Sequence, residues 1–289
     1  MYENEILLVE KLLESYPVRW RRNYYNNKKT LKINKIDELD SILGIVCGRY
    51  DEEKNLITLY NDTAIIHELF HSCFRDAEKL NKQVDDFEWY YSNGIAMKNK
   101  TNNIKYGLAL TEGFVEYLSR KISSSKGYVF EYFIVDLLIS IYGEDILKYP
   151  FTNDVIGFYE DERFYKIENL LFELDSYQTY RRTIRRYIEY SKVIIEKADK
   201  KTDKEIKLVK EIMDQINKMI KELYNSIIKC INIIIKEYKN CKCPMIEKED
   251  FVLKLRQYLV NPDYQVIVTL LALNKCDLNK KVQKILKRF

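Results

Sequence analysis

Two histidines separated by one helical turn are the residues in this sequence whose spacing most clearly predicts chemistry. The chain has only two histidines, His67 and His71, and Glu68 directly follows the first of them. On an α-helix, positions four apart lie on the same face, so both imidazoles could bind one metal ion. Glu68 would stand beside the first ligand, within reach of a metal-bound water. The spacing therefore predicts a metal site on a helix.

A metal site needs a further protein ligand, and the sequence restricts where that ligand can come from. The chain contains no third histidine. Glu78 lies two turns beyond His71, about 10 Å along the same helix, and is out of reach. Cys73 lies two residues after His71, and positions two apart on a helix do not face each other. A second helix must therefore supply a carboxylate or a thiolate; otherwise the two histidines are ordinary buried side chains.

Residues 110–117, with the sequence L-T-E-G-F-V-E-Y, are the best source of that ligand. Together with H-E-x-x-H, this segment resembles the gluzincin branch of the zincin metallopeptidases. Thermolysin-like members carry N-E-x-x-x-D here, and gluzincin aminopeptidases carry N-E-G-F. Thr111 stands where both carry Asn, and Glu116 stands where the thermolysin-like members carry Asp. The order of strand, metal helix, inserted hairpin and Glu-Gly helix is also similar to bacterial zincin-like proteins of unassigned substrate.

The resemblance implies roles for individual residues. His67, His71 and Glu112 would bind Zn²⁺, and Glu116 would accept a hydrogen bond from the other nitrogen of a ligand imidazole. Gly113, which lacks a side chain, would let the two helices or a substrate approach closely. Without a metal, Glu112 would be an acidic residue that the helix dipole favours at a helix N-terminus.

The implied reaction is zinc-dependent hydrolysis of a peptide bond in a peptide or protein substrate. Glu68 would accept a proton from the metal-bound water and pass it to the departing amine. A tyrosine or an arginine would stabilise the oxyanion because the chain has no spare histidine, and Tyr128 is the first choice. The other candidates for this role are Tyr177, Tyr180 and Arg181. An extended substrate would pair with a sheet edge formed by residues 93–97 or 56–60.

The elements that must position these residues are predominantly helical. The chain has only 8 glycines and 4 prolines, and no glycine follows Gly157. We predict an α+β fold with a small β-sheet, in which residues 1–175 form a zincin-like catalytic domain and residues 176–289 form an all-helical domain. The second domain should contain a long amphipathic helix over residues 204–238, where apolar residues recur every three or four positions.

Local patterns predict the elements of the first domain. The predicted helices cover residues 3–15, 64–80 and 111–122. The predicted hairpins pair residues 42–50 with 56–60 and residues 95–97 with 105–110. Asp62 or Thr63 would cap the metal helix, and Thr111 would cap the helix of Glu112. Residues 18–30, which are basic and aromatic, predict a surface segment that leads into a short helix near residues 36–39.

Composition excludes several other classes of protein. No segment has the pattern of a signal peptide or a membrane span, and six cysteines are too few for a disulfide framework, so we expect a cytoplasmic protein. The last 89 residues carry 19 basic and 11 acidic residues, but no nucleic-acid-binding motif, which favours a solvated face. The alternative function is a helical interaction or regulatory protein with a structural or degenerate zinc site.

Overall fold

The structure is a computed structural model that describes residues 2–36, 47–84, 89–101, 104–124, 127–197, 203–260, 271, 276–287 and 289. Within these residues the protein is predominantly helical, with two small sheets. The chain divides into two compact units, Met1–Ile167 with Cys241–Met245 and Glu168–Asn240 with Ile246–Phe289. The predicted boundary after residue 175 falls inside helix α8 (Ile167–Lys197). No helix described here has both the length and the apolar composition needed to cross a bilayer.

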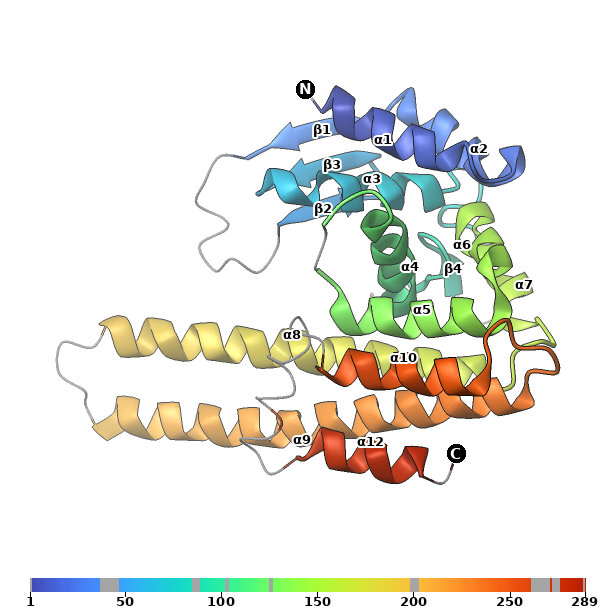
Figure 1. The fold of residues 1–289 in the computed structure, drawn as a ribbon. Helices are drawn as coiled ribbons and strands as arrows, with labels where there is room; N and C mark the ends of the chain where they lie inside the picture. Colours follow the sequence, from blue (N-terminus) through green and yellow to red (C-terminus); the bar gives the residue numbers. More distant parts are fainter. Residues whose placement is uncertain are drawn as a thin grey trace. The chain divides into compact units, whose positions relative to one another are not determined.

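Both sheets belong to the first unit (Figure 1). The first sheet has the order β1-β3-β2, with strands Lys32–Lys35, Leu56–Leu59 and Gly48–Asp51. Strand β3 pairs parallel with β1 and antiparallel with β2, so it is the central strand. The second sheet is antiparallel and has the order β4-β5-β6, with strands Trp89–Tyr91, Met97–Asn99 and Lys105–Tyr106.

Helix α3 (Ile65–Phe74) is the central helix of the first unit, and all 10 of its residues are buried. It contacts α1 (Glu3–Leu13), α2 (Val18–Lys28), strands β2 and β3, and α4 (Leu108–Arg120), as Figure 1 shows. The other α-helices of this unit are α5 (Val129–Tyr142), α6 (Lys148–Thr152) and α7 (Val155–Tyr159). Short 3₁₀ helices cover Asp62–Ala64 and Glu144–Leu147.

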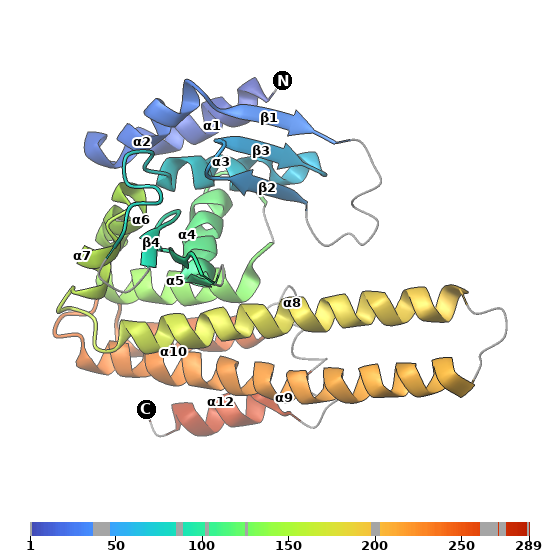
Figure 2. The ribbon, with the colours of Figure 1, turned by 180° about the vertical axis from the view of Figure 1, so that it is seen from behind.

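The second unit is built around two long helices, α8 and α9 (Asp203–Asn240), which lie side by side in both views (Figures 1 and 2). The predicted helix over residues 204–238 is confirmed by α9. Its buried stripe consists of Ile212, Ile216, Ile220, Leu223, Ile227, Ile231 and Ile234. Lys229 of α9 and Glu173 of α8 form an ion pair at 2.9 Å. Helix α12 (Leu278–Leu286) packs against α9, and α10 (Lys248–Val260) belongs to the same unit.

The metal helix is shorter than predicted. Instead of continuing to residue 80, α3 ends at Phe74, and Arg75 has an extended backbone with φ −79° and ψ 119°. The side-chain amide of Asn27 donates hydrogen bonds to the carbonyls of Ser72 and Arg75, so carbonyls at the helix end are already satisfied. At the other end α3 follows the 3₁₀ helix Asp62–Ala64 directly and has no side-chain cap, so neither Asp62 nor Thr63 caps it; Asn61 caps the 3₁₀ helix by accepting from the Thr63 N–H.

The second helix begins earlier than predicted, at Leu108 instead of Thr111. Gly107 precedes it with φ +77°, a left-handed conformation that glycine adopts easily. The Thr111 hydroxyl donates back to the Gly107 carbonyl, so Thr111 lies inside the first turn and not at the cap. Of the predicted strand over residues 105–110, only Lys105–Tyr106 is a strand.

The basic segment over residues 18–30 was expected to be a surface segment, but most of it forms α2. Trp20, Tyr24 and Asn27 make a buried face along that helix, which explains why it folds as one. The hairpin of 42–50 with 56–60 is confirmed where β2 pairs with β3, and residues 42–46 lie outside the described residues. The short helix predicted near residues 36–39 also lies outside them, apart from Ile36.

Candidate metal centre

Helix α3 places its two histidines as the motif predicts. The imidazole rings of His67 and His71 have centroids 5.1 Å apart and lie at 71° to each other. Apolar neighbours on the helix, including Leu69 and Phe70, are fully buried and fix it in the core of the unit. Because the helix is held on all sides, both rings have little freedom to turn away from each other.

The carboxylate of Glu112 on α4 meets both imidazoles. Its Oε2 atom lies 3.2 Å from the Nε2 atom of His67 and 3.2 Å from that of His71.

Gly113 sets the packing of α4, because a Cβ atom there would come within 2.5 Å of the Glu131 carbonyl oxygen in α5. The close approach that Gly113 permits is therefore between α4 and α5.

The separation of these three groups fits a bound metal ion. Ligands about 2.1 Å from a tetrahedral centre lie about 3.4 Å from one another. The two measured separations of 3.2 Å agree with that value, and all three ligand atoms lie within 4.8 Å of one another. The buried group of His67, His71 and Glu112 could therefore hold a metal ion.

Glu116 lies one turn after Glu112 and fixes the orientation of one imidazole. Its Oε2 atom lies 3.2 Å from Nδ1 of His67, so an Nδ1–H donor would leave the Nε2 lone pair available to a metal ion bound between His67 and Glu112. The other carboxylate oxygen accepts from Arg120 Nε at 2.8 Å and from the Gly127 N–H at 3.2 Å. Burial raises the pKa of Glu116, but the hydrogen bonds from His67 and Arg120 outweigh it and lower the pKa to about 2.

The ligands form a cluster of coupled charges in the interior. Burial lowers the pKa of His67, but hydrogen bonds with Glu112 and Glu116 outweigh burial and raise it to about 10. Burial also opposes ionisation of Glu112, yet the two imidazoles hold the pKa of its carboxyl well below its usual value. Both carboxylates thus stay ionised, and ionised groups at this depth need a positive partner, which a proton or a metal ion can provide.

Glu68 lies on the side of α3 that faces strand β2. A Cβ atom on Gly48 would approach Glu68 Oε1 to 3.0 Å, so the strand backbone lies directly against this carboxylate. Burial raises the pKa of Glu68, and the positive charges of His71 and His67 and a hydrogen bond from the Tyr50 backbone oppose that shift. A carboxyl group with a raised pKa beside two metal ligands is suited to exchanging protons.

Of the predicted tyrosines, the structure brings Tyr128 to this site. Its ring stacks on the ring of His67, with centroids 5.1 Å apart and planes at 16°. Its role as the oxyanion donor stays a prediction. Cys73 is buried and directs Sγ to the Leu69 carbonyl at 3.6 Å, away from the group of possible ligands. The other candidates, Tyr177, Tyr180 and Arg181, belong to the second unit.

Two residues near the site were not predicted from the sequence. The ring of Tyr50 stacks on His71 at 6.2 Å and 7°, while its hydroxyl donates to Asn55 Oδ1 at 2.8 Å. The side-chain amide of Asn93 donates to the His71 carbonyl at 2.8 Å. Neither contact has a local sequence signal, because each depends on segments that meet only in the fold.

Neither sheet edge proposed for the substrate is an edge in the structure. Strand β3, over residues 56–59, is central in its sheet. Residues 93–96 are buried and make a turn in which the Ala96 N–H donates to the Asn93 carbonyl. Among the described residues, β2 is the terminal strand of its sheet beside α3.

No model of a known protein family matches the chain, and neither the curated proteins nor the solved structures contain a match to it.

Proposed function

We propose that the protein is a zinc-dependent metallopeptidase with a zincin-like core of the gluzincin type. The observation that carries this proposal is that one oxygen of Glu112 lies 3.2 Å from Nε2 of both His67 and His71. Two imidazoles and one glutamate are the ligands of a catalytic zinc site, which keeps its fourth position for water or substrate. Glu68 in the same motif supplies the base that such a site needs.

Each residue around this centre would have a different role. Bound zinc would supply a Lewis acid and a water whose pKa is lowered to about 7. His67, His71 and Glu112 would hold the ion, and Glu116 would keep the proton of His67 on Nδ1. Glu68 would accept the proton of the attacking water and return it to the leaving amine, and its burial raises its pKa toward the range in which it can do both.

Substrate binding follows from the position of strand β2. This strand is adjacent to α3 and ends its sheet among the described residues, so an extended peptide could pair with it close to Glu68. Tyr128, stacked on His67, is the residue that we assign to stabilising the oxyanion.

One observation supports the alternative of a structural zinc site in an interaction protein. The ligands His67, His71 and Glu112 are only 7%, 8% and 7% exposed, as in a closed structural centre. A structural site, however, has no use for a carboxyl group beside its ligand, so the two functions differ in what they require of Glu68.

The test combines metal content with cleavage of a peptide library. We expect about one zinc per chain and cleavage that falls by about 10²- to 10⁴-fold in Glu68→Gln, with zinc retained. Glu78→Gln, an exposed carboxylate just after the same helix, is the matched control and should keep both properties. Zinc in the wild type without cleavage of any library peptide would favour the structural alternative, and a chain that binds no zinc would contradict both.

A further inference from the structure

The outer face of helix α2 is a basic surface on an otherwise acidic unit. Residues 15–36 contain seven basic residues and no acidic one. The rest of residues 1–167 contains 27 acidic and 15 basic residues. Four of the seven basic residues lie on α2 itself, so positive charge is concentrated along this helix, while the rest of the unit carries a net negative charge. The helix is therefore the part of this unit to which an anionic partner would be drawn.

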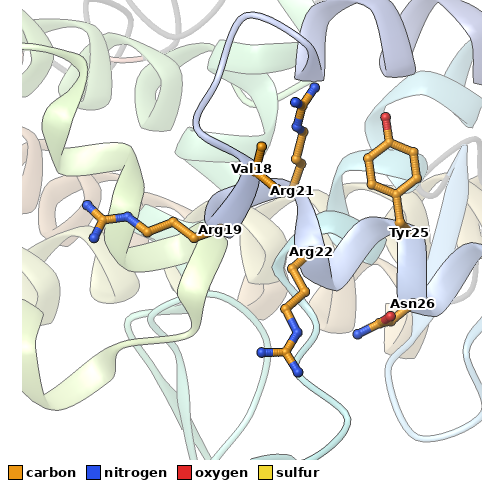
Figure 3. A pocket seen from close by; sticks show the side chains of 6 residues that line it. All are labelled: Val18, Arg19, Arg21, Arg22, Tyr25 and Asn26. Carbon is orange, nitrogen blue, oxygen red and sulfur yellow. The ribbon is translucent and has the colours of Figure 1, made fainter.

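A hollow of about 420 Å³ lies on this face, and its lining residues are shown in Figure 3. Arg21 and Tyr25 point to one side of the helix, and Arg22 and Asn26 point to the other. The guanidinium groups spread over the face and do not converge, so three of them cannot grip one small anion. This arrangement fits an extended ligand that carries several negative charges.

The arginines on this face differ in their partners from the lysines that follow them in the sequence. Lys28 and Lys35, from the same basic stretch, form ion pairs with Glu10 and Asp62. Within the part of the chain that the structure describes, Arg19, Arg21 and Arg22 form no ion pair or side-chain hydrogen bond. Three neighbouring positive charges repel one another, so an acidic ligand would relieve that repulsion.

The opposite face of α2 anchors the helix. Trp20 and Tyr24 are 5% and 0% exposed, and the side chain of Asn27 donates to the Ser72 and Arg75 carbonyls at the end of α3. An anchored helix holds its outer residues in a fixed array. Ordering the helix therefore adds nothing to the free-energy cost of binding there.

We propose that this face, formed by Val18, Arg19, Arg21, Arg22, Tyr25 and Asn26 and called here the α2 face, docks a short acidic segment of a polypeptide. Val18 is 71% exposed and Tyr25 is 39% exposed, and they would pack against an apolar residue of that segment. Arginine and tyrosine together are typical of protein interfaces. An 11-residue helix is about 16 Å long, which matches about five residues of an extended peptide.

A nucleic acid fits this face less well. Proteins that bind nucleic acids through the backbone commonly make about six to ten phosphate contacts, and three arginines would provide about half of the smaller number. A longer polyanion would also pass over the acidic remainder of the unit, whereas a short peptide would contact α2 alone. This docking surface does not depend on the metal centre. If both proposals hold, it would recruit acidic proteins to the peptidase.

Fluorescence anisotropy of a labelled glutamate-rich decapeptide containing two leucines tests the proposal. Each exposed charge pair contributes modestly, so we expect Arg19→Gln/Arg21→Gln/Arg22→Gln, which removes three of them, to weaken binding roughly tenfold at low salt. The matched control is Lys207→Gln/Lys210→Gln/Lys218→Gln on α9, which removes the same charge from exposed positions and should change binding less than twofold. Fluorescence of Trp20 checks that α2 is folded in each variant. If the triple variant does not fold, Arg22→Gln alone is measured in its place, and we expect it to weaken binding less than tenfold.

Two further probes sharpen the result. Tyr25→Ala should weaken binding of the leucine-containing peptide but not of an all-glutamate peptide, because Tyr25 supplies apolar contact. Equal weakening by the arginine and lysine variants, or no binding of the peptide by the wild type, would overturn the proposal. Tighter binding of a ten-nucleotide oligo-dT that the arginine variant abolishes would also overturn it, in favour of a nucleic acid. These measurements use zinc-loaded and chelator-treated protein, so their outcome is separate from that of Glu68→Gln.

Discussion

The two units of this protein differ in how their buried ionisable side chains are grouped. The interior of the first unit contains five ionisable groups around one centre, none of them more than 8% exposed: His67, Glu68, His71, Glu112 and Glu116. The second unit buries the isoleucine-rich stripe of α9, and its buried carboxylates, Glu173 and Glu237, do not belong to such a cluster among the described residues. Apolar burial stabilises a fold, whereas a buried charge destabilises it by several kcal/mol unless a partner compensates. The clustered groups of the first unit therefore require a compensating partner, which a proton or a metal ion can provide.

The tryptophans allow the two units to be followed separately. Trp20 and Trp89 are the only tryptophans of the chain, and both lie in the first unit. Their fluorescence therefore reports unfolding of that unit, while amide hydrogen exchange in α9 reports the second.

Removing the metal should produce the largest difference between the units. A ligand present at a thousand times its dissociation constant stabilises the folded state by about 4 kcal/mol, and only the first unit has the predicted zinc ligands among the described residues. We expect a chelator to lower the unfolding midpoint seen by tryptophan fluorescence and to leave hydrogen exchange in α9 unchanged. Equal loss of protection in both units would contradict the assignment of the metal to the first unit.

Ile231→Ala tests the other side of the comparison. Ile231 is 1% exposed on α9, and truncating a buried isoleucine to alanine destabilises by about 2–5 kcal/mol. Hydrogen exchange in α9 should accelerate, while the zinc content and the tryptophan transition should stay as in the wild type. Ile206→Ala on the same helix, at a position 52% exposed, is the control and should have little effect. A loss of zinc in Ile231→Ala would show that the units are not independent.

Gly113→Ala should destabilise the first unit by about 1–3 kcal/mol. A Cβ atom there would lie 2.5 Å from the Glu131 carbonyl oxygen and 2.9 Å from its carbon, so helices α4 and α5 would have to separate. Tryptophan fluorescence during urea unfolding measures the effect. Gly127→Ala is the control, because its nearest neighbour would lie at an ordinary 3.5 Å. A variant as stable as the wild type would mean that the packing of α4 does not depend on this glycine.

The predictions from the sequence agree with the structure where a feature is determined by residues close together in the chain. The spacing of His67 and His71 predicts their common face because helical periodicity needs no other part of the chain. The end of α3, by contrast, depends on Asn27, which lies 45 residues before Ser72, and no pattern within the helix reveals it. The stacking of Tyr50 on His71 likewise requires strand β2 to lie against α3, which is a property of the fold.

The same difference between local and long-range determinants explains why the predictions for α2 and for the start of α4 were wrong. Residues 18–30 look like a solvated segment because their basic residues outnumber the buried ones, yet Trp20 and Tyr24 at one-turn spacing are enough to bury a face. Thr111 looks like a helix cap, but Gly107 can adopt the left-handed conformation that starts α4 one turn earlier. The proposed role of Glu112 came from a family resemblance, and the structure places its carboxylate between the histidines.

Glu116→Gln should weaken metal binding without removing it. Glutamine can still accept the hydrogen bond from His67 Nδ1 but lacks the negative charge, and loss of such a partner typically lowers metal affinity by about 10- to 100-fold. A competition titration with a zinc chelator of known affinity measures the change. Glu144→Gln provides the control, since that carboxylate pairs with Lys121 near the surface. Unchanged affinity in Glu116→Gln would remove Glu116 from the metal centre.

Asp161→Asn should have the smallest effect and should depend on pH. The Asp161 carboxylate pairs with Arg163 at 2.7 Å and accepts a hydrogen bond from Tyr149. Burial raises the pKa of Asp161, but the hydrogen bonds from Arg163 and Tyr149 outweigh burial and lower this pKa to about 2. Because this pKa is below the usual value, the ionised form stabilises the first unit above about pH 4, and the stabilisation is lost as the pH falls toward 2. Solvent screening limits it to about 1 kcal/mol.

The wild type should therefore be slightly more stable than Asp161→Asn at pH 7, and the two proteins should converge near pH 2. Urea unfolding followed by tryptophan fluorescence across this range measures the difference, and zinc-free protein at every pH keeps the metal ligands from contributing a pH-dependent binding term. A constant difference at all pH values would mean that the carboxamide disturbs packing around Tyr149. In that case the contrast with the second unit would rest on the group around His67 alone.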